Sequence, residues 1–105
     1  MPSRSEIYLH RIATVLNFNP IGAHSDGLNI TAVVELAVPE GATKIMLQAF
    51  VQNVRYTLDG TDPTATLGFQ LVASAPPVTL IVESRATVKV IEEAATADLQ
   101  YQWST

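Results

Sequence analysis

The sequence contains no cysteine, and only 15% of its 105 residues are charged. Without thiols, disulfides and thiolate metal sites are excluded. Two histidines, His10 and His24, are too few for a histidine-based metal cluster without carboxylates. No apolar run reaches the ~20 residues that a membrane-spanning helix needs. The five glycines are scattered singly, so no glycine-rich phosphate-binding loop is present.

Basic residues are also scarce. Six Lys and Arg stand against ten Asp and Glu, for a net charge of −4. A nucleic-acid-binding protein needs a basic surface that displaces counterions, so we expect no nucleic-acid partner. The lack of a long apolar run leads us to expect no membrane partner. Residues 1–6 lack the apolar core of a secretory signal, and we expect synthesis in the cytoplasm. The length predicts a single domain, residues 7–105, preceded by a flexible arm, residues 1–6.

Apolar residues make up 48% of the chain, which is high beside so little charge. Two interpretations remain open. The first is a dense core beneath a surface of Thr, Gln and Asn. The second is an exposed apolar patch, and such patches usually mark an interface.

Apolar and polar residues alternate with a period of two along most of the chain, which is typical of half-buried strands. The alternation predicts strands at residues 30–38, 45–52, 54–59, 67–71, 78–83, 87–91 and 99–103. Residues 7–18 are ambiguous, with a strand favoured, and residues 19–28 are dense in turn formers and predict a loop. Seven or eight short strands at this spacing predict an all-β protein, an antiparallel β-sandwich with Greek-key or jelly-roll wiring.

The run from Asn53 to Leu71 reads as a strand, a polar turn and a second strand. Asp59, Thr61 and Asp62 in the turn are the best candidate metal ligands. A calcium site requires six to eight oxygen ligands, several of them from carboxylates, and this loop provides two carboxylates. A turn in which Asp side chains bond local backbone amides is therefore favoured, and we expect no cofactor.

No group of residues indicates catalysis, and we expect that the protein is not an enzyme. No serine occupies a nucleophile-elbow context, and adjacent Glu92 and Glu93 would point to opposite faces of a strand. Four aromatic residues form the remaining candidate for a binding site, as a platform for sugar stacking: Tyr56, Phe69, Tyr101 and Trp103. Tyr56, Tyr101 and Trp103 fall on phases that elsewhere carry Val and Leu, which favours the core, although Trp103 near the end of the chain is also a candidate anchor on a neighbouring subunit.

Residues 55–66 with residues 68–71 carry a family resemblance. The stretch Arg55-Tyr-Thr-Leu-Asp-Gly-Thr-Asp-Pro-Thr-Ala-Thr66 is similar to a pattern "R-Y-x-L-D-G-T-x-P-T-A-x-x-G" in small virion proteins of tailed bacteriophages. The likeness covers roughly the last half of the chain. A shorter pattern, "Y-T-x-D-G-T-x-P-T", resembles β-sandwich modules attached to bacterial glycosidases.

The phage resemblance implies a head cement or decoration protein, located on the capsid surface of the virion. Such proteins bind the major capsid protein as trimers or dimers, so a homotrimer is expected first and a dimer second. Neck and tail structural proteins, and a carbohydrate-binding accessory module, are the alternatives. The alternation pattern places Met46, Phe50, Ile81 and Ile91 opposite the expected core, and with Trp103 these are the expected interface residues.

Overall fold

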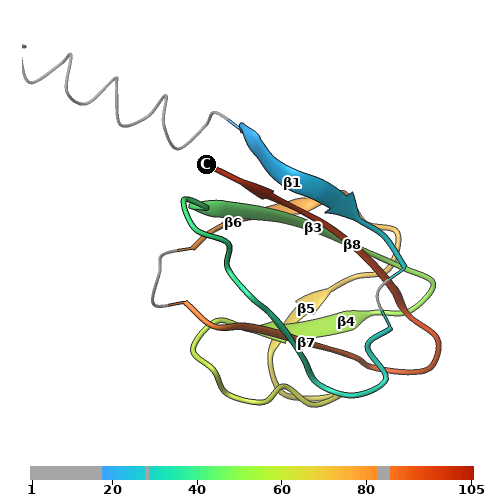
Figure 1. Cartoon of the computed structure of the whole chain (residues 1–105). Coiled ribbons are helices and arrows are strands. Elements are labelled where there is room, and N and C mark those ends of the chain that lie inside the picture. Colours follow the sequence, from blue (N-terminus) through green and yellow to red (C-terminus); the bar gives the residue numbers. More distant parts are fainter. Residues whose placement is uncertain (1–17, 28, 83–85) are drawn as a thin grey trace, which may run out of the picture.

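The computed structural model describes residues 18–27, 29–82 and 86–105, which form two packed four-stranded antiparallel sheets (Figure 1). The first sheet contains, in spatial order, β1 (Pro20–Ser25), β8 (Asp98–Ser104), β3 (Lys44–Phe50) and β6 (Val78–Ile81). The second contains β2 (Val34–Leu36), β7 (Val88–Glu92), β4 (Val54–Thr57) and β5 (Phe69–Leu71). No helix occurs in these residues, so the predicted antiparallel β-sandwich is confirmed. The arm, residues 1–6, and most of the ambiguous segment 7–18 lie outside the described residues.

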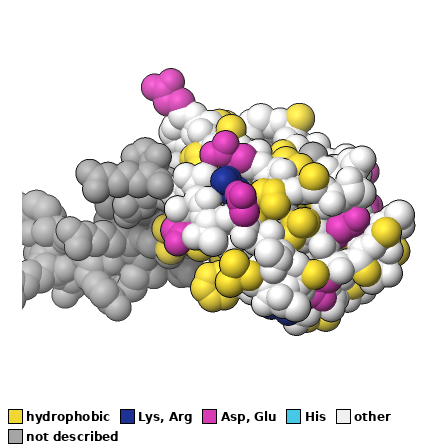
Figure 2. Space-filling model, turned by 90° about the horizontal axis from the view of Figure 1, so that it is seen from below, with side chains coloured by type: hydrophobic (Ala, Val, Ile, Leu, Met, Phe, Trp, Pro, Cys, Tyr) yellow, Lys and Arg dark blue, Asp and Glu magenta, His cyan; other side chains and the backbone are white. Residues whose placement is uncertain are grey.

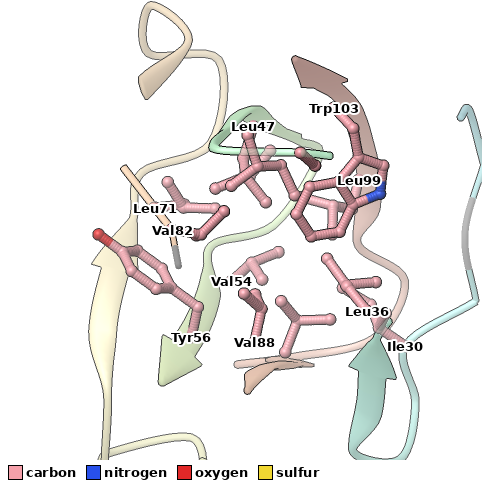
Figure 3. Packing of buried hydrophobic residues seen from close by; sticks show 14 residues of the cluster. Ile30, Leu36, Leu47, Val54, Tyr56, Leu71, Val82, Val88, Leu99 and Trp103 are labelled. Atoms are coloured by element: carbon pink, nitrogen blue, oxygen red, sulfur yellow. The ribbon is translucent and has the colours of Figure 1, made fainter. Parts of the chain in front are cut away.

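The core lies between the inner faces of the two sheets (Figure 3). In β3, Ile45, Leu47 and Ala49 are buried and alternate with half-buried residues, because successive side chains of a strand point to opposite faces. Tyr56 and Trp103 lie at opposite ends of the cluster. The alternation in the sequence therefore identified the inner faces of the central strands.

The loop predicted at residues 19–28 is wrong, because β1 occupies most of it. β1 pairs antiparallel with β8 at an edge of the first sheet, and its register is irregular between Ile21 and Ser25. The Gln102 side chain donates hydrogen bonds to the carbonyls of Ile21 and Gly22. An edge strand tolerates proline and glycine, since half of its backbone groups pair with nothing in the sheet. β8 supplies the pairing that made this segment a strand.

Two other strands are shorter than the pattern predicts. The strand expected over residues 30–38 is reduced to β2, although Ile30 remains buried. β3 ends at Phe50, and Val51 is 67% exposed instead of facing the core. Val51 has a φ of 71°, which turns the chain toward β4. The hydropathy pattern of the sequence does not indicate this change of backbone direction.

Candidate functional site

The polar turn after β4 is held by its own side chains. The Asp59 carboxylate accepts a hydrogen bond from the Thr61 backbone N–H, with 3.0 Å between Oδ1 and N. The Thr57 hydroxyl donates to the Thr61 carbonyl, and Gly60 has a positive φ of 89°. The bond from residue 61 back to the carboxylate of residue 59 is an Asx turn. The Asx-turn interpretation is therefore confirmed for Asp59.

The carboxylates of the turn are bound to protein groups. Bonds from the backbone and side chain of Thr61 lower the pKa of Asp59. Asp62 accepts from Lys89, 2.8 Å away, and this hydrogen bond raises the pKa of Lys89. Across residues 18–27, 29–82 and 86–105, no group of three or more His, Cys, Asp and Glu side chains is placed to hold a metal ion. The turn thus orders the chain between β4 and β5.

Arg55 and Gly68 bind the two strands of the motif to each other. The Arg55 guanidinium pairs with Glu93 and donates to the Gly68 carbonyl, with 2.9 Å between Nη1 and O. A Cβ on Gly68 would lie 2.9 Å from the Tyr56 carbonyl oxygen, and its φ is 122°. Only glycine fits this position without displacing backbone. The motif residues therefore define the fold of the second sheet.

A shallow pocket of about 490 Å³ opens beside this turn. Its lining combines the turn with the start of β5, and the members are Thr57, Leu58, Asp59, Thr61, Leu67, Gly68 and Phe69. Phe69 is 63% exposed, and its ring centroid lies 5.5 Å from that of Tyr56. The pocket is therefore walled on one side by an accessible aromatic ring.

The other aromatic residues do not form a stacking platform. Tyr56 and Trp103 are each only 8% exposed, and Tyr101 is half-buried against Trp103 in an edge-to-face contact of 6.3 Å. Phe69 alone of the four is well exposed. The core interpretation of Tyr56 and Trp103 agrees with these positions, and Trp103 packs within its own subunit.

The five residues expected at an interface lie in three different places. Met46, Phe50 and Ile81 belong to the outer face of the first sheet, where Met46 and Phe50 are half-buried and Ile81 is 61% exposed. Ile91 lies opposite Arg55 on the outer face of the second sheet. Trp103 is in the core. The structure brings only the first three to one face.

Most of the large apolar side chains that are well exposed in the described residues, Ile81 among them, lie along β5, β6 and their connection. Of six large apolar side chains that are well exposed in the described residues, five fall within residues 67–81: Leu67, Phe69, Val72, Val78 and Ile81. β6 is one of the two edge strands of the first sheet and β5 is one of the two of the second, and residues 72–77 join them. We call residues 67–81 the β5–β6 side.

The sixth exposed residue, Val51, adjoins the β5–β6 side. Asn53 Oδ1 accepts a hydrogen bond from the Ala73 backbone, and the Ala49 carbonyl accepts one from Ser74. The β3–β4 turn that carries Val51 is therefore held against the β5–β6 connection. The alternation puts Leu67, Phe69 and Val78 in phase with the buried residues Leu71 and Val82, and the two prolines Pro76 and Pro77 were the available sequence signal of a sheet edge.

Figure 2 shows the face of the molecule seen from below, where apolar side chains are interspersed with more acidic than basic ones.

In the described part of the chain, no helix has the length and apolar character that crossing a membrane requires. Compared with known proteins, the chain matches no family model, no curated protein and no solved structure.

Proposed function

We propose that this protein is a non-enzymatic structural component of a tailed-phage virion. In this role it binds the outer face of the capsid and cements or decorates neighbouring capsomers. The sequence resemblance of residues 55–71 supports this assignment. The observation that carries it is the concentration of exposed apolar side chains on the β5–β6 side. Large apolar side chains left exposed along one side of a small domain are typical of a protein–protein interface.

The proposed mechanism is the burial of this apolar surface. Fully burying one large apolar side chain contributes about 1.5–3 kcal/mol. The entropy lost on association and on side-chain ordering offsets much of that free energy, so several apolar side chains must be buried to form one stable contact. On a shell, copies that also contact one another bind with added avidity, because the first contact positions the next.

The wiring of the sandwich fits this proposal. Eight strands lie in two four-stranded sheets, and the chain crosses between the sheets at every connection except β4 to β5. We propose that this is a jelly roll, an arrangement common in viral capsid proteins. The resemblance implies self-association as a trimer or a dimer, with the major capsid protein as the second partner and the virion as the location.

Co-sedimentation with capsid shells tests the proposal. Shells assembled from the major capsid protein of the same genome are expected to carry the wild-type chain into the pellet at a saturating ratio. Val72→Asp, on the β5–β6 side, is expected to weaken binding at least tenfold. Ala37→Asp, an exposed position following β2 on the opposite edge, is expected to bind as wild type. A wild-type chain that stays in the supernatant would contradict the proposal.

A carbohydrate-binding accessory module is the second candidate, and the pocket beside Phe69 favours it. An exposed ring next to the Asp59 carboxylate is a suitable arrangement for stacking and hydrogen bonding with a sugar. Titration with oligosaccharides, followed by amide chemical shifts, separates the two candidates. Saturable shifts confined to residues around Phe69, with no capsid binding, would replace the first proposal by this one.

A further inference from the structure

We propose that β6 pairs with β6 of a second copy across a twofold axis, making one continuous eight-stranded sheet from the first sheets of two subunits. This inference rests on the self-association included in the proposed function and names its geometry. Of the two assemblies that the resemblance implies, it selects the dimer.

The edge strands differ in how they resist pairing with another chain. β1 starts with a proline and has an irregular register, and β2 has only three residues, of which Glu35 is charged. β5 also has only three residues. β6 has four, Val-Thr-Leu-Ile; Pro76 and Pro77 precede it, but the strand itself has no charge, proline or bulge, and it keeps an unbroken register with β3. Natural edges are usually blunted by such devices, so β6 is the described edge best suited to a partner strand.

The backbone of β6 has its free groups at two known positions. The Val82 N–H donates to the Thr43 carbonyl, so residue 82 turns its hydrogen-bonding groups toward β3. In an antiparallel pair this orientation alternates along the strand, which assigns Val78 and Leu80 to bonding with β3. The N–H and C=O groups of Thr79 and Ile81 therefore point to the open edge.

These positions fix one register for a twofold pair. With Leu80 opposite Leu80 of the second copy, Thr79 lies opposite Ile81 in both directions. Each of these two pairs then exchanges two backbone hydrogen bonds. Any other twofold register brings fewer of the free groups of Thr79 and Ile81 into opposing pairs. The side chains match as well, because Ile81, now 61% exposed, would pack beside Thr79 of the other subunit.

The absence of charge on β6 favours a second copy as the occupant. The chain has a net charge of −4, so two copies on average repel each other, and an uncharged strand adds no charge repulsion where the copies meet. β6 meets that condition, and the apolar side chains on the β5–β6 side extend the neutral surface around it. A twofold contact also closes on itself and does not grow into fibres.

Cysteine cross-linking tests the register directly, since the chain has no cysteine of its own. Leu80→Cys would place two thiols opposite each other in a non-hydrogen-bonded pair, where Cα atoms are about 4.5 Å apart. That separation lies within the range of about 4.4–6.8 Å for disulfides. We expect mild oxidation to convert this variant to a covalent dimer. The matched control, Thr79→Cys, has its thiols two residues out of register, beyond about 7 Å, and is expected to cross-link at least tenfold more slowly.

Proline substitution provides a second test that does not depend on thiol chemistry. Thr79→Pro removes an N–H from the open edge and leaves the bonds to β3 in place, so we expect a folded monomer by sedimentation velocity. Equal cross-linking of the two cysteine variants, a monomeric wild type, or a dimeric Thr79→Pro would each overturn the pairing. Capsid co-sedimentation of Thr79→Pro separates the two proposals. Retained binding leaves the structural role intact whatever the cross-linking shows.

Discussion

Two residues of the second sheet show how far local chemistry is readable from the sequence. The Asx turn at Asp59 follows from side-chain chemistry within a few residues, and the sequence predicts it. The hydrogen bond from Arg55 to the Gly68 carbonyl joins residues on adjacent strands. Spacing alone does not predict that bond, because it depends on the register of β4 against β5.

Gly68 and Gly41 give a prediction at this scale. Both have a positive φ, but only Gly68 is crowded, since an added Cβ would lie 2.9 Å from the Tyr56 carbonyl oxygen. Gly41 has open space around it. Gly41→Ala is expected to cost about 1 kcal/mol through backbone strain alone, and Gly68→Ala clearly more. Urea unfolding measures both, and equal losses would show that the close approach at Gly68 is not as described.

Val51 gives a prediction in the opposite direction. A β-branched residue with a φ of 71° is strained, and its side chain is 67% exposed, so little packing compensates. Val51→Gly is expected to stabilise the fold by about 1 kcal/mol and to raise Tm by several degrees. Val72→Gly, at an exposed valine without positive φ, serves as the control and should not stabilise. A lower Tm for Val51→Gly would contradict the assigned turn.

At the scale of elements, the sequence predicted the strands that form the core and missed β1. Ile45, Leu47, Val88 and Val90 alternate with more exposed residues, and all four are buried. β1 has proline, glycine and histidine in place of a strand pattern, and it is a strand because β8 pairs with it. Edge strands are least predictable from composition, since only one side of their backbone is bonded.

The ion pair between Arg55 of β4 and Glu93, the residue after β7, predicts how stability depends on pH. Burial raises the pKa of Glu93, but hydrogen bonds from Arg55, Gln70 and Asn53 and the charge of Arg55 outweigh it, so the pKa lies below its usual 4.5. A lowered pKa in the folded state stabilises the fold above the unfolded-state value, and this contribution is lost as pH falls through the folded-state pKa. Stability is therefore expected to drop as pH falls below 4.5.

Glu93→Gln isolates that contribution. The variant is expected to be less stable than wild type at pH 7 and to lose less stability on acidification, measured by urea unfolding at a series of pH values. Asp59→Asn is the matched comparison, because the pKa of Asp59 in the wild type is also lowered, but by hydrogen bonds within one turn. If Glu93→Gln kept the full acid dependence of wild type, Glu93 would not be a source of it.

At the scale of the whole molecule, the sequence left open whether its many apolar residues fill a core or cover a surface. The described residues include both, since a core of fourteen buried apolar residues coexists there with exposed ones on the β5–β6 side. Alternation along a strand tells which side chains share a face. It does not tell which strands end a sheet, and that order decides which apolar residues remain exposed. The interface residues expected from the alternation pattern alone are therefore dispersed. Ile81 lies on the outer face of the first sheet and Ile91 on the outer face of the second.

Sedimentation velocity over a range of concentrations tests most directly whether the β5–β6 side is an association surface. We expect the mass of the wild-type protein to rise above the 11.3 kDa of one chain as concentration reaches the high micromolar range. Val72→Asp is expected to shift this rise to higher concentration, and Ala37→Asp to leave it unchanged. A wild-type protein that stays at 11.3 kDa throughout would contradict the account.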